Sequence, residues 1–488
     1  VNASAGFGTA PPDVTSGPGT EGGHGGNVTL RVTQPGALSY IAAGSIDASG
    51  AGGGYTGDSL ASGGVGGAGG SVRFEFGTSG APGVNGGAVS LAGANLNGGW
   101  GGSNALDDPN SDGSAGSVTA IAYGGNLTVG IAGQGYAGVN AFYETVFLEA
   151  NQGQVLSGSG GANTDVTAKS VHVTAATGIG SQGAPLKVWE DYYCYSCFYS
   201  LHFTNATGDV HIASDYTMHV DEGSSGGSIT LRAPEIALNR DFGNVAASGN
   251  VTYVADALSL SGSGSLGNTS SGAGLDNYVR IKPFSTTNIS EVPNARDIRL
   301  TTAGAIKDTG VALNLDEDFV ARISAPTLRV GDQGDSNVGN VMVFKGDLGS
   351  NTFTVPSIVG KLLLETEVSM MQDASLIVQG ALTVVAGGNI NVSAGLTATG
   401  DVTLTGGNGI TNFGTITGPA GVTLNAGTGA FINASDQLNH GVVTNAAGVG
   451  TITVNADSID LQTGSNIAAN TAQVVIKPAT ATRSMLVD

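Results

Sequence analysis

Four short triplets decide the fold: Leu382-Thr383-Val384, Val402-Thr403-Leu404, Val422-Thr423-Leu424 and Ile452-Thr453-Val454. Each has the order apolar, threonine, apolar, so the period-2 alternation of a strand places two apolar side chains on one face and the threonine on the other. Successive triplets begin 20, 20 and 30 residues apart. A strand that returns in phase after about 20 residues is typical of a solenoid, in which each coil buries its apolar face against its neighbours.

The first half of the chain has the same signal with longer connections. Two adjacent glycines precede a strand-like segment at six places, and we expect positive φ angles at these tight corners. The six segments are Gly25-Gly26-Asn27-Val28, Gly69-Gly70-Ser71-Val72, Gly86-Gly87-Ala88-Val89, Gly124-Gly125-Asn126-Leu127, Gly226-Gly227-Ser228-Ile229 and Gly387-Gly388-Asn389-Ile390.

Long runs rich in Gly, Ser and Asn separate some of these strands, as in residues 48–70 and 98–117. Such a composition is also typical of flexible linkers. Because strand signals resume after each run, we favour loops that project from the coils.

Helix signals are nearly absent, which predicts an all-β protein. Turn signals every 8–12 residues also occur in β-sandwiches and barrels. Those folds lack the in-phase recurrence after 20 residues, whereas stacked parallel strands let small polar residues form ladders from coil to coil. The sequence therefore favours a β-solenoid of parallel strands.

A longer repeat overlies the short one. Val279-Arg280-Ile281-Lys282-Pro283 recurs 195 residues later as Val474-Val475-Ile476-Lys477-Pro478. We therefore expect two regions, a glycine-rich solenoid with long loops over residues 1–275 and a regular solenoid module over residues 276–488.

The charge balance excludes some partners. Lys and Arg total 17 and Asp and Glu total 38, for a net charge of −21. Binding to nucleic acid or to an anionic membrane requires clustered Lys and Arg, so neither is expected. No apolar run is long enough for a transmembrane helix. The chain begins at Val1 without a basic, apolar leader, which predicts a mature form or an excerpt of a longer precursor.

Several segments of the second region resemble the repeats of filamentous-haemagglutinin-type exoproteins. These are Asp401-Val402-Thr403-Leu404, Gly388-Asn389-Ile390-Asn391-Val392, residues 321–332 and the Ile-Lys-Pro signature at 281–287. The resemblance covers about residues 280–488. It implies a right-handed parallel β-helix, secretion through a partner outer-membrane pore (two-partner secretion), and a role in adhesion or biofilm at the bacterial cell surface. The chain departs from that family in lacking an Asn-Pro-Asn-Gly-like secretion motif.

An aromatic segment over residues 189–203 stands out in an aromatic-poor chain. It contains Cys194 and Cys197, the only two cysteines. We favour a local disulfide that shapes an exposed loop in an oxidising compartment. A zinc site with His202 and His211, or reduced thiols, remain alternatives, although the Cys and His spacing fits no common zinc site.

Exposed aromatic side chains offer rigid contact area with a polar tip. One hypothesis is that the segment binds a glycan, another subunit or a host surface. The competing interpretation is a loop packed on its own solenoid. The binding residues of the first hypothesis are Trp189, Tyr192, Tyr193, Tyr195, Phe198 and Tyr199.

An acidic loop has oxygen-bearing side chains at Asp107, Asp108, Asn110 and Asp112. Such ligands suit Ca²⁺, but no Glu closes the loop as in an EF-hand, and a solvated loop is favoured. We therefore expect no cofactor, with calcium at this loop as the alternative. The triplet Asp316-Glu317-Asp318 is expected to be a solvated corner.

Three classes of function are compatible with a parallel β-helix. A polysaccharide-degrading enzyme would need clustered carboxylates in a groove, and the acids here are scattered, so we expect no catalysis. A secreted adhesin that contacts cell-surface glycans or proteins is favoured. The alternative is a subunit that assembles with copies of itself into a filament or sheath, because neither end has an amphipathic capping helix over its strand edges.

Overall fold

The structure is a computed structural model. It describes residues 21–33, 39–53, 64–79, 86–97, 114–130, 138–190, 200–239, 245–261, 266–268, 277–284, 296–302, 312–335, 338–344, 352–357, 359–435, 439–446 and 449–483. Two compact units, Val1–Ile229 and Thr230–Asp488, divide the chain within strand β15 (Ile229–Arg232). The predicted composition boundary near residue 275 is a separate property of the sequence and stays a prediction.

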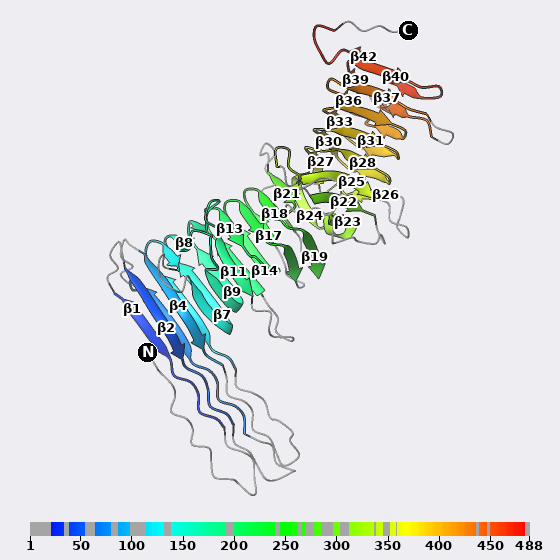
Figure 1. The fold of residues 1–488 in the computed structure, drawn as a ribbon. Helices are drawn as coiled ribbons and strands as arrows, with labels where there is room; N and C mark the ends of the chain where they lie inside the picture. Colours follow the sequence, from blue (N-terminus) through cyan, green and yellow to red (C-terminus); the bar gives the residue numbers. More distant parts are fainter. Residues whose placement is uncertain are drawn as a thin grey trace, which may run out of the picture. The chain divides into compact units, whose positions relative to one another are not determined.

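Parallel strands stack coil upon coil in the first unit (Figure 1). One ladder carries a column of inward apolar residues, of which Val72, Val118 and Val146 have no exposed surface. Its strands are β1 (Val28–Val32), β3 (Ser71–Phe76), β5 (Ser117–Ala122), the second half of β7 (Val139–Ala150) and of β9 (Val166–Ala175), β12 (Ser200–Asn205) and β14 (Met218–Ser225).

Two further ladders complete each coil of this unit. The first halves of β7 and β9 pair with each other, and β9 pairs with β11 (Leu186–Glu190). The remaining ladder consists of β2 (Tyr40–Asp47), β4 (Gly87–Asn95), β6 (Leu127–Val129), β8 (Gln154–Ser157), β10 (Gly178–Ile179) and β13 (Val210–Ala213).

Glycine-rich segments of the first unit run side by side and are joined by backbone hydrogen bonds, in the blue part of Figure 1. The Gly67 amide donates to the Ala51 carbonyl at 2.8 Å. Three residues further on, the Gly70 amide donates to the Ala48 carbonyl at 2.7 Å. This bundle, which we call the glycine arm, comprises residues 21–26, 48–53, 64–70, 95–97 and 114–116. These backbone hydrogen bonds are what the projecting-loop prediction expects of the described residues; residues 54–63 and 98–113 lie outside them, and there the choice between loops and linkers stays a prediction.

Glycines of the arm recur every third residue, at positions where neighbouring segments approach one another closely. A Cβ atom at any of six glycines would lie within 2.1 Å of a carbonyl oxygen of a neighbouring segment, far inside contact distance. They form three pairs with a spacing of three: Gly22 and Gly25, Gly50 and Gly53, Gly67 and Gly70. The arm can therefore pack this closely only because these positions have no side chain.

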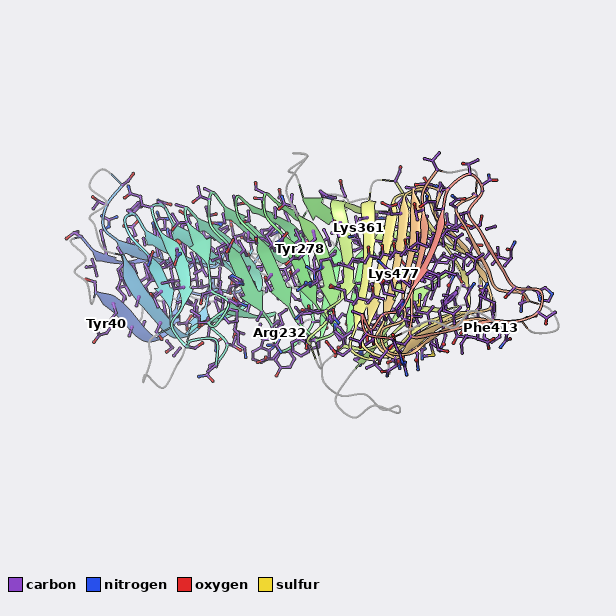
Figure 2. All side chains as sticks on the ribbon, turned by 90° about the horizontal axis from the view of Figure 1, so that it is seen from above. Tyr40, Arg232, Tyr278, Lys361, Phe413 and Lys477 are labelled. Atoms are coloured by element: carbon purple, nitrogen blue, oxygen red, sulfur yellow. The ribbon has the colours of Figure 1, made fainter. Side chains whose placement is uncertain are left out.

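Three parallel ladders also form most of the second unit. The first consists of β18 (Val251–Val254), β21 (Tyr278–Lys282), β24 (Ile323–Gly331), β27 (Val359–Thr366), β30 (Ala381–Ala386), β33 (Asp401–Gly406), β36 (Gly421–Asn425), β39 (Ile452–Asn455) and β42 (Val474–Lys477). Figure 2 shows Tyr278, Lys361 and Lys477 on the strands of this ladder.

The second and third ladders have eight and six strands. The eight are β22 (Arg296–Thr301), β23 (Ala312–Asp316), β25 (Val338–Phe344), β28 (Met370–Gln372), β31 (Asn389–Val392), β34 (Gly409–Asn412), β37 (Ala430–Asn433) and β40 (Ser458–Leu461). The six are β26 (Thr352–Val355), β29 (Ser375–Val378), β32 (Leu396–Ala398), β35 (Thr415–Thr417), β38 (Val442–Thr444) and β41 (Asn466–Ala468). Smaller parallel pairs join β16 (Glu235–Asn239) to β19 (Ala257–Ser261) and β17 (Val245–Ala247) to β20 (Leu266–Asn268).

The register confirms the prediction from the four triplets. Leu382 lies beside Val402, Val402 beside Val422, and Val422 beside Ile452. All four side chains are at most 1% exposed, and the intervening threonines form the outward column. The steps of 20, 20 and 30 residues are therefore successive coils of a parallel β-helix.

The two five-residue copies of the longer repeat lie at β21 and β42, two strands of the first ladder. In the first copy the amide of Phe284 donates to the Asp256 carboxylate at 3.0 Å. In the second copy the amide of Thr480 donates to the Asp457 carboxylate at 2.7 Å. The two coils differ in length, since Val251 pairs with Val279 after 28 residues and Ile452 pairs with Val474 after 22, so the 195-residue repeat outside the five-residue motif stays a prediction.

The six double glycines all lie at the beginnings of strands, as predicted, but positive φ angles are not the reason that glycine occurs there. Of their twelve glycines only Gly125, with φ 67°, has a positive φ angle. A Cβ at Gly226 would lie 2.1 Å from the Ala206 carbonyl oxygen, which belongs to the preceding coil. Close approach between coils, and not a left-handed corner, requires glycine at such positions.

The acidic triplet at residues 316–318 is not merely a solvated corner. Asp316 is the N-cap of α1 (Glu317–Val320), and its carboxylate accepts from the Phe319 amide at 2.7 Å. A carboxylate at this position satisfies a helix amide that would otherwise lack a partner. The turn holds Phe319 and Val320 in the core.

Candidate binding surfaces

A stacked aromatic pair lies on the surface of the first unit. Trp189 of β11 stacks on Tyr216, which follows β13, with ring centroids 5.2 Å apart and an interplanar angle of 23°. Tyr216 is 55% exposed. We call Trp189 and Tyr216 the aromatic platform, because a flat exposed ring beside a second ring offers contact area without loss of side-chain freedom.

The platform is built by strand alternation. In β11, Leu186 and Val188 point into the core, so Lys187 and Trp189 point outward together. β11 pairs with β13 so that Lys187 lies beside Ala213, and Asp215 and Tyr216, two and three residues after Ala213, contact Lys187 and Trp189. The Lys187 ammonium donates to the Asp215 carboxylate at 2.8 Å, so an ion pair flanks the two stacked rings.

Two acids are buried in this unit. Glu144 of β7 has no exposed surface, and one carboxylate oxygen accepts from the Leu96 amide at 3.2 Å. Burial raises the pKa of Glu144 to about 7, against the opposing effects of that hydrogen bond and of Lys169. Burial also raises the pKa of Asp165, although the Lys187 amide donates to its carboxylate at 2.9 Å.

Aromatic rings on three successive coils also stack on one another. Phe147 of β7 stacks on His172 of β9 at 4.8 Å, and His172 stacks on His202 of β12 at 4.4 Å. Burial lowers the pKa of His172 to about 4, with a smaller contribution from His202. The neutral His172 imidazole therefore packs as a structural part of the ladder. The carboxylate of Asp221 lies 3.5 Å from the His202 ring.

One charged cluster covers β21, β24 and β27 in the second unit. Arg329 donates to both oxygens of Glu365, at 3.0 and 2.7 Å. Arg280 donates to Asp332 at 3.0 Å, and the guanidinium groups of both Arg280 and Arg329 lie over the Tyr278 ring. Since these carboxylates neutralise the cations beside them, the cluster does not provide the unpaired positive charge that a phosphate would require.

Most of the residues predicted to bind lie outside the described ranges. Trp189 is described and is part of the platform, whereas Tyr192, Tyr193, Tyr195, Phe198 and Tyr199 are not described. The same holds for Cys194, Cys197, Asp107, Asp108, Asn110 and Asp112, so the disulfide and calcium predictions stay predictions. Within the described ranges no three or more His, Cys, Asp or Glu side chains are grouped so as to hold a metal ion.

Tyr216 is a surface residue that the sequence did not single out. It lies 27 positions after Trp189, with no aromatic pattern of its own. The apolar alternation in β11 and β13 indicates that both strands exist. The pairing of β11 with β13 across one coil decides which side chains meet, and that pairing depends on the lengths of the connections.

Comparison with family models, with curated proteins and with solved structures found no match to this chain. Among the described residues no helix is long and apolar enough to cross a membrane.

Proposed function

We propose that the chain is an extracellular, non-catalytic adhesive β-solenoid of the filamentous-haemagglutinin type, which binds surface glycans through the aromatic platform. The observation that carries the proposal is the stacked pair of Trp189 and half-exposed Tyr216 on a solenoid coil. Sugars present a face of C–H groups to such rings and hydroxyl groups to a flanking ion pair such as Lys187 and Asp215.

A rigid scaffold increases the effect of such a platform. Every coil shares main-chain hydrogen bonds with its neighbours, so the rings are held before the ligand arrives and little conformational entropy is lost on binding. The acidic net charge of −21 disfavours adsorption to anionic surfaces and leaves contacts through rings and hydroxyl groups as the main attraction.

The test is binding of purified chain to immobilised cell-surface glycans, measured for the wild type and for a Trp189→Ala, Tyr216→Ala double variant. We expect at least a tenfold loss of affinity in the double variant. Tyr216→Phe, which keeps the ring, should bind as the wild type does. The matched control is Tyr40→Ala, because Tyr40 is also an exposed aromatic of the first unit, 58% exposed. Equal binding by the double variant and the Tyr40→Ala control would overturn the proposal.

A further inference from the structure

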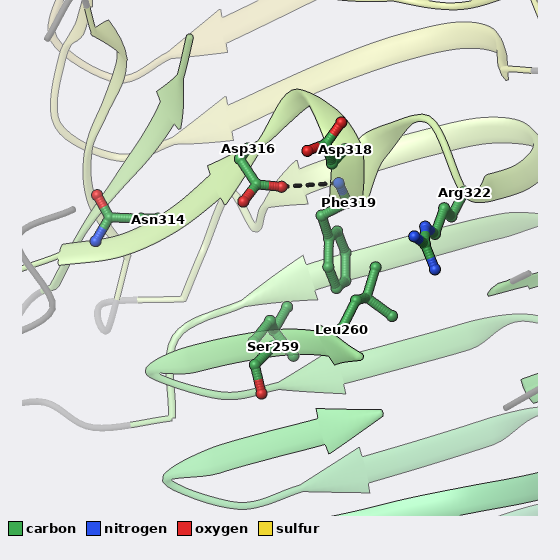
Figure 3. Close-up of a pocket in the computed structure, with 8 residues that line it drawn as sticks. Ser259, Leu260, Asn314, Asp316, Asp318, Phe319 and Arg322 are labelled. Atoms are coloured by element: carbon green, nitrogen blue, oxygen red, sulfur yellow. Dashed lines mark hydrogen bonds between the residues drawn. The ribbon is translucent and has the colours of Figure 1, made fainter. Parts of the chain in front are cut away.

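A small cleft lies in the second unit, between β19 and the turn that follows β23. Its volume is about 240 Å³. Figure 3 shows its walls, with Leu260 of β19 below the Phe319 ring of α1 and Arg322 to one side. It is separate from the aromatic platform, which belongs to the first unit.

The sequence builds this cleft from two short elements. The Asp316 cap fixes the α1 turn by accepting from the Phe319 amide, and this directs the Phe319 ring inward, where it is 4% exposed. One turn later the chain leaves α1 at Arg322, whose backbone carbonyl accepts from the Leu266 amide at 2.9 Å. The backbone on which the Arg322 side chain stands is therefore held in place.

The polar groups of the cleft include a hydrogen-bond donor, the Arg322 guanidinium, and an acceptor, the Asp318 carboxylate. The Nη1 atom of Arg322 is buried and has no hydrogen-bond partner among the described residues. A buried guanidinium donor without an acceptor is costly, so a ligand oxygen that the Arg322 side chain turns to meet in the cleft would be stabilised. Asp318 is exposed at the rim, and its carboxylate accepts hydrogen bonds from a ligand that donates them.

We propose that this cleft binds one pyranose residue of a neutral or aminated sugar. A hydroxyl or ring oxygen accepts from Arg322, and a second hydroxyl or an ammonium group donates to Asp318. The apolar face of the ring packs toward Leu260 and Phe319. Two carboxylates against one guanidinium give the lining a formal charge of −1, so a uronic acid is repelled.

The size of the cleft restricts the ligand to about one sugar. Drug-sized ligands occupy pockets of roughly 300–1,000 Å³, and this cleft is smaller. Its volume equals that of roughly eight water molecules at about 30 Å³ each. A single ring at the end of a glycan, or a branch, therefore fits better than an extended chain.

The test is saturation-transfer NMR and calorimetry on the whole chain with three probes: methyl glucopyranoside, methyl glucosaminide and methyl glucuronide. We expect saturable binding of the first two and at least tenfold weaker binding of the glucuronide. Asp318→Asn and Arg322→Gln should each weaken binding at least tenfold. The matched control is Asp373→Asn, which makes the same charge change at an exposed position outside the cleft.

Three outcomes would overturn the proposal: no saturable binding of either sugar, a glucuronide that binds as well as the glucoside, or an Asp318→Asn variant that binds as the Asp373→Asn control does. Arg322→Lys, which keeps a donor, separates lost binding from a damaged fold. The double variant of Trp189 and Tyr216 should retain binding in the cleft. Failure of the platform and failure of the cleft are thus distinguishable.

Discussion

Replacing Gly67 with alanine tests whether the glycine arm is a packed bundle. The new Cβ would lie 2.1 Å from the Gly23 carbonyl oxygen, whereas C···O contacts are normally about 3.3 Å or longer. The two backbones must therefore move apart by roughly 1 Å. Overpacking of this kind costs about 1–3 kcal/mol, and weakening the bond from the Gly67 amide to the Ala51 carbonyl costs about 1 kcal/mol more.

The expected sum of about 2–4 kcal/mol should appear as local opening, measured by hydrogen–deuterium exchange of residues 64–70. Because 1.4 kcal/mol is a factor of ten, amides there should exchange at least about 30-fold faster. The control is Gly44→Ala in β2, where a Cβ meets nothing within 4 Å. Equal protection of the arm in both variants would refute the close packing described for it.

Three further changes test the solenoid itself. Leu404→Ala, at a residue with no exposed surface, should cost about 2–5 kcal/mol in denaturant unfolding, whereas the outward Thr403→Ala should cost under about 1 kcal/mol. Asn433→Ala should destabilise by about 1–3 kcal/mol, because its amide oxygen accepts from Asn412 and its amide nitrogen donates to the Gly441 carbonyl; an unchanged melting temperature would count against that network. Glu144 has a folded pKa raised to about 7 from 4.5, so its contribution to stability is present below about pH 4.5 and is lost as the pH rises to about 7. Glu144→Gln should flatten this dependence in thermal melts across that range, and an unchanged slope would contradict the buried state of the carboxyl.

The architecture of the second unit was predictable because its signal is local and repeated. The triplets at residues 382, 402, 422 and 452 each specify an inward and an outward face, and their recurrence after 20, 20 and 30 residues places those faces in register. A coil of about 20 residues has few alternatives once its apolar face must be covered by the next coil.

The glycine arm was harder to predict, because its packing involves no apolar periodicity. The usable signal was a three-residue spacing of glycine, as in Gly22 and Gly25 or Gly67 and Gly70. The prediction of positive φ angles at the double glycines was wrong for a related reason. Both a left-handed corner and a close backbone approach favour glycine, and composition alone does not separate them.

The surface sites depend on contacts between distant residues. Trp189 was selected because it lies in an aromatic segment of an aromatic-poor chain. Its partner Tyr216 is determined by the pairing of β11 with β13. The cleft joins Leu260 to Asp318 and Arg322 across more than fifty residues. The lengths of the connections between strands decide which of these distant residues come into contact. Secondary-structure propensities carry no information about those contacts.

The stacking of coils in the second unit has a mechanical consequence. Hydrogen bonds between coils run along the stacking direction, so a pull on one end loads the last coil before any other. A coil of 20 residues, such as that from Leu382 to Val402, occupies about 4.8 Å along the stack and releases roughly 70 Å of chain when it peels away. A cell tethered by such a chain would meet a series of small, sequential releases, each of which lengthens the tether and limits the peak force on the bond at its tip.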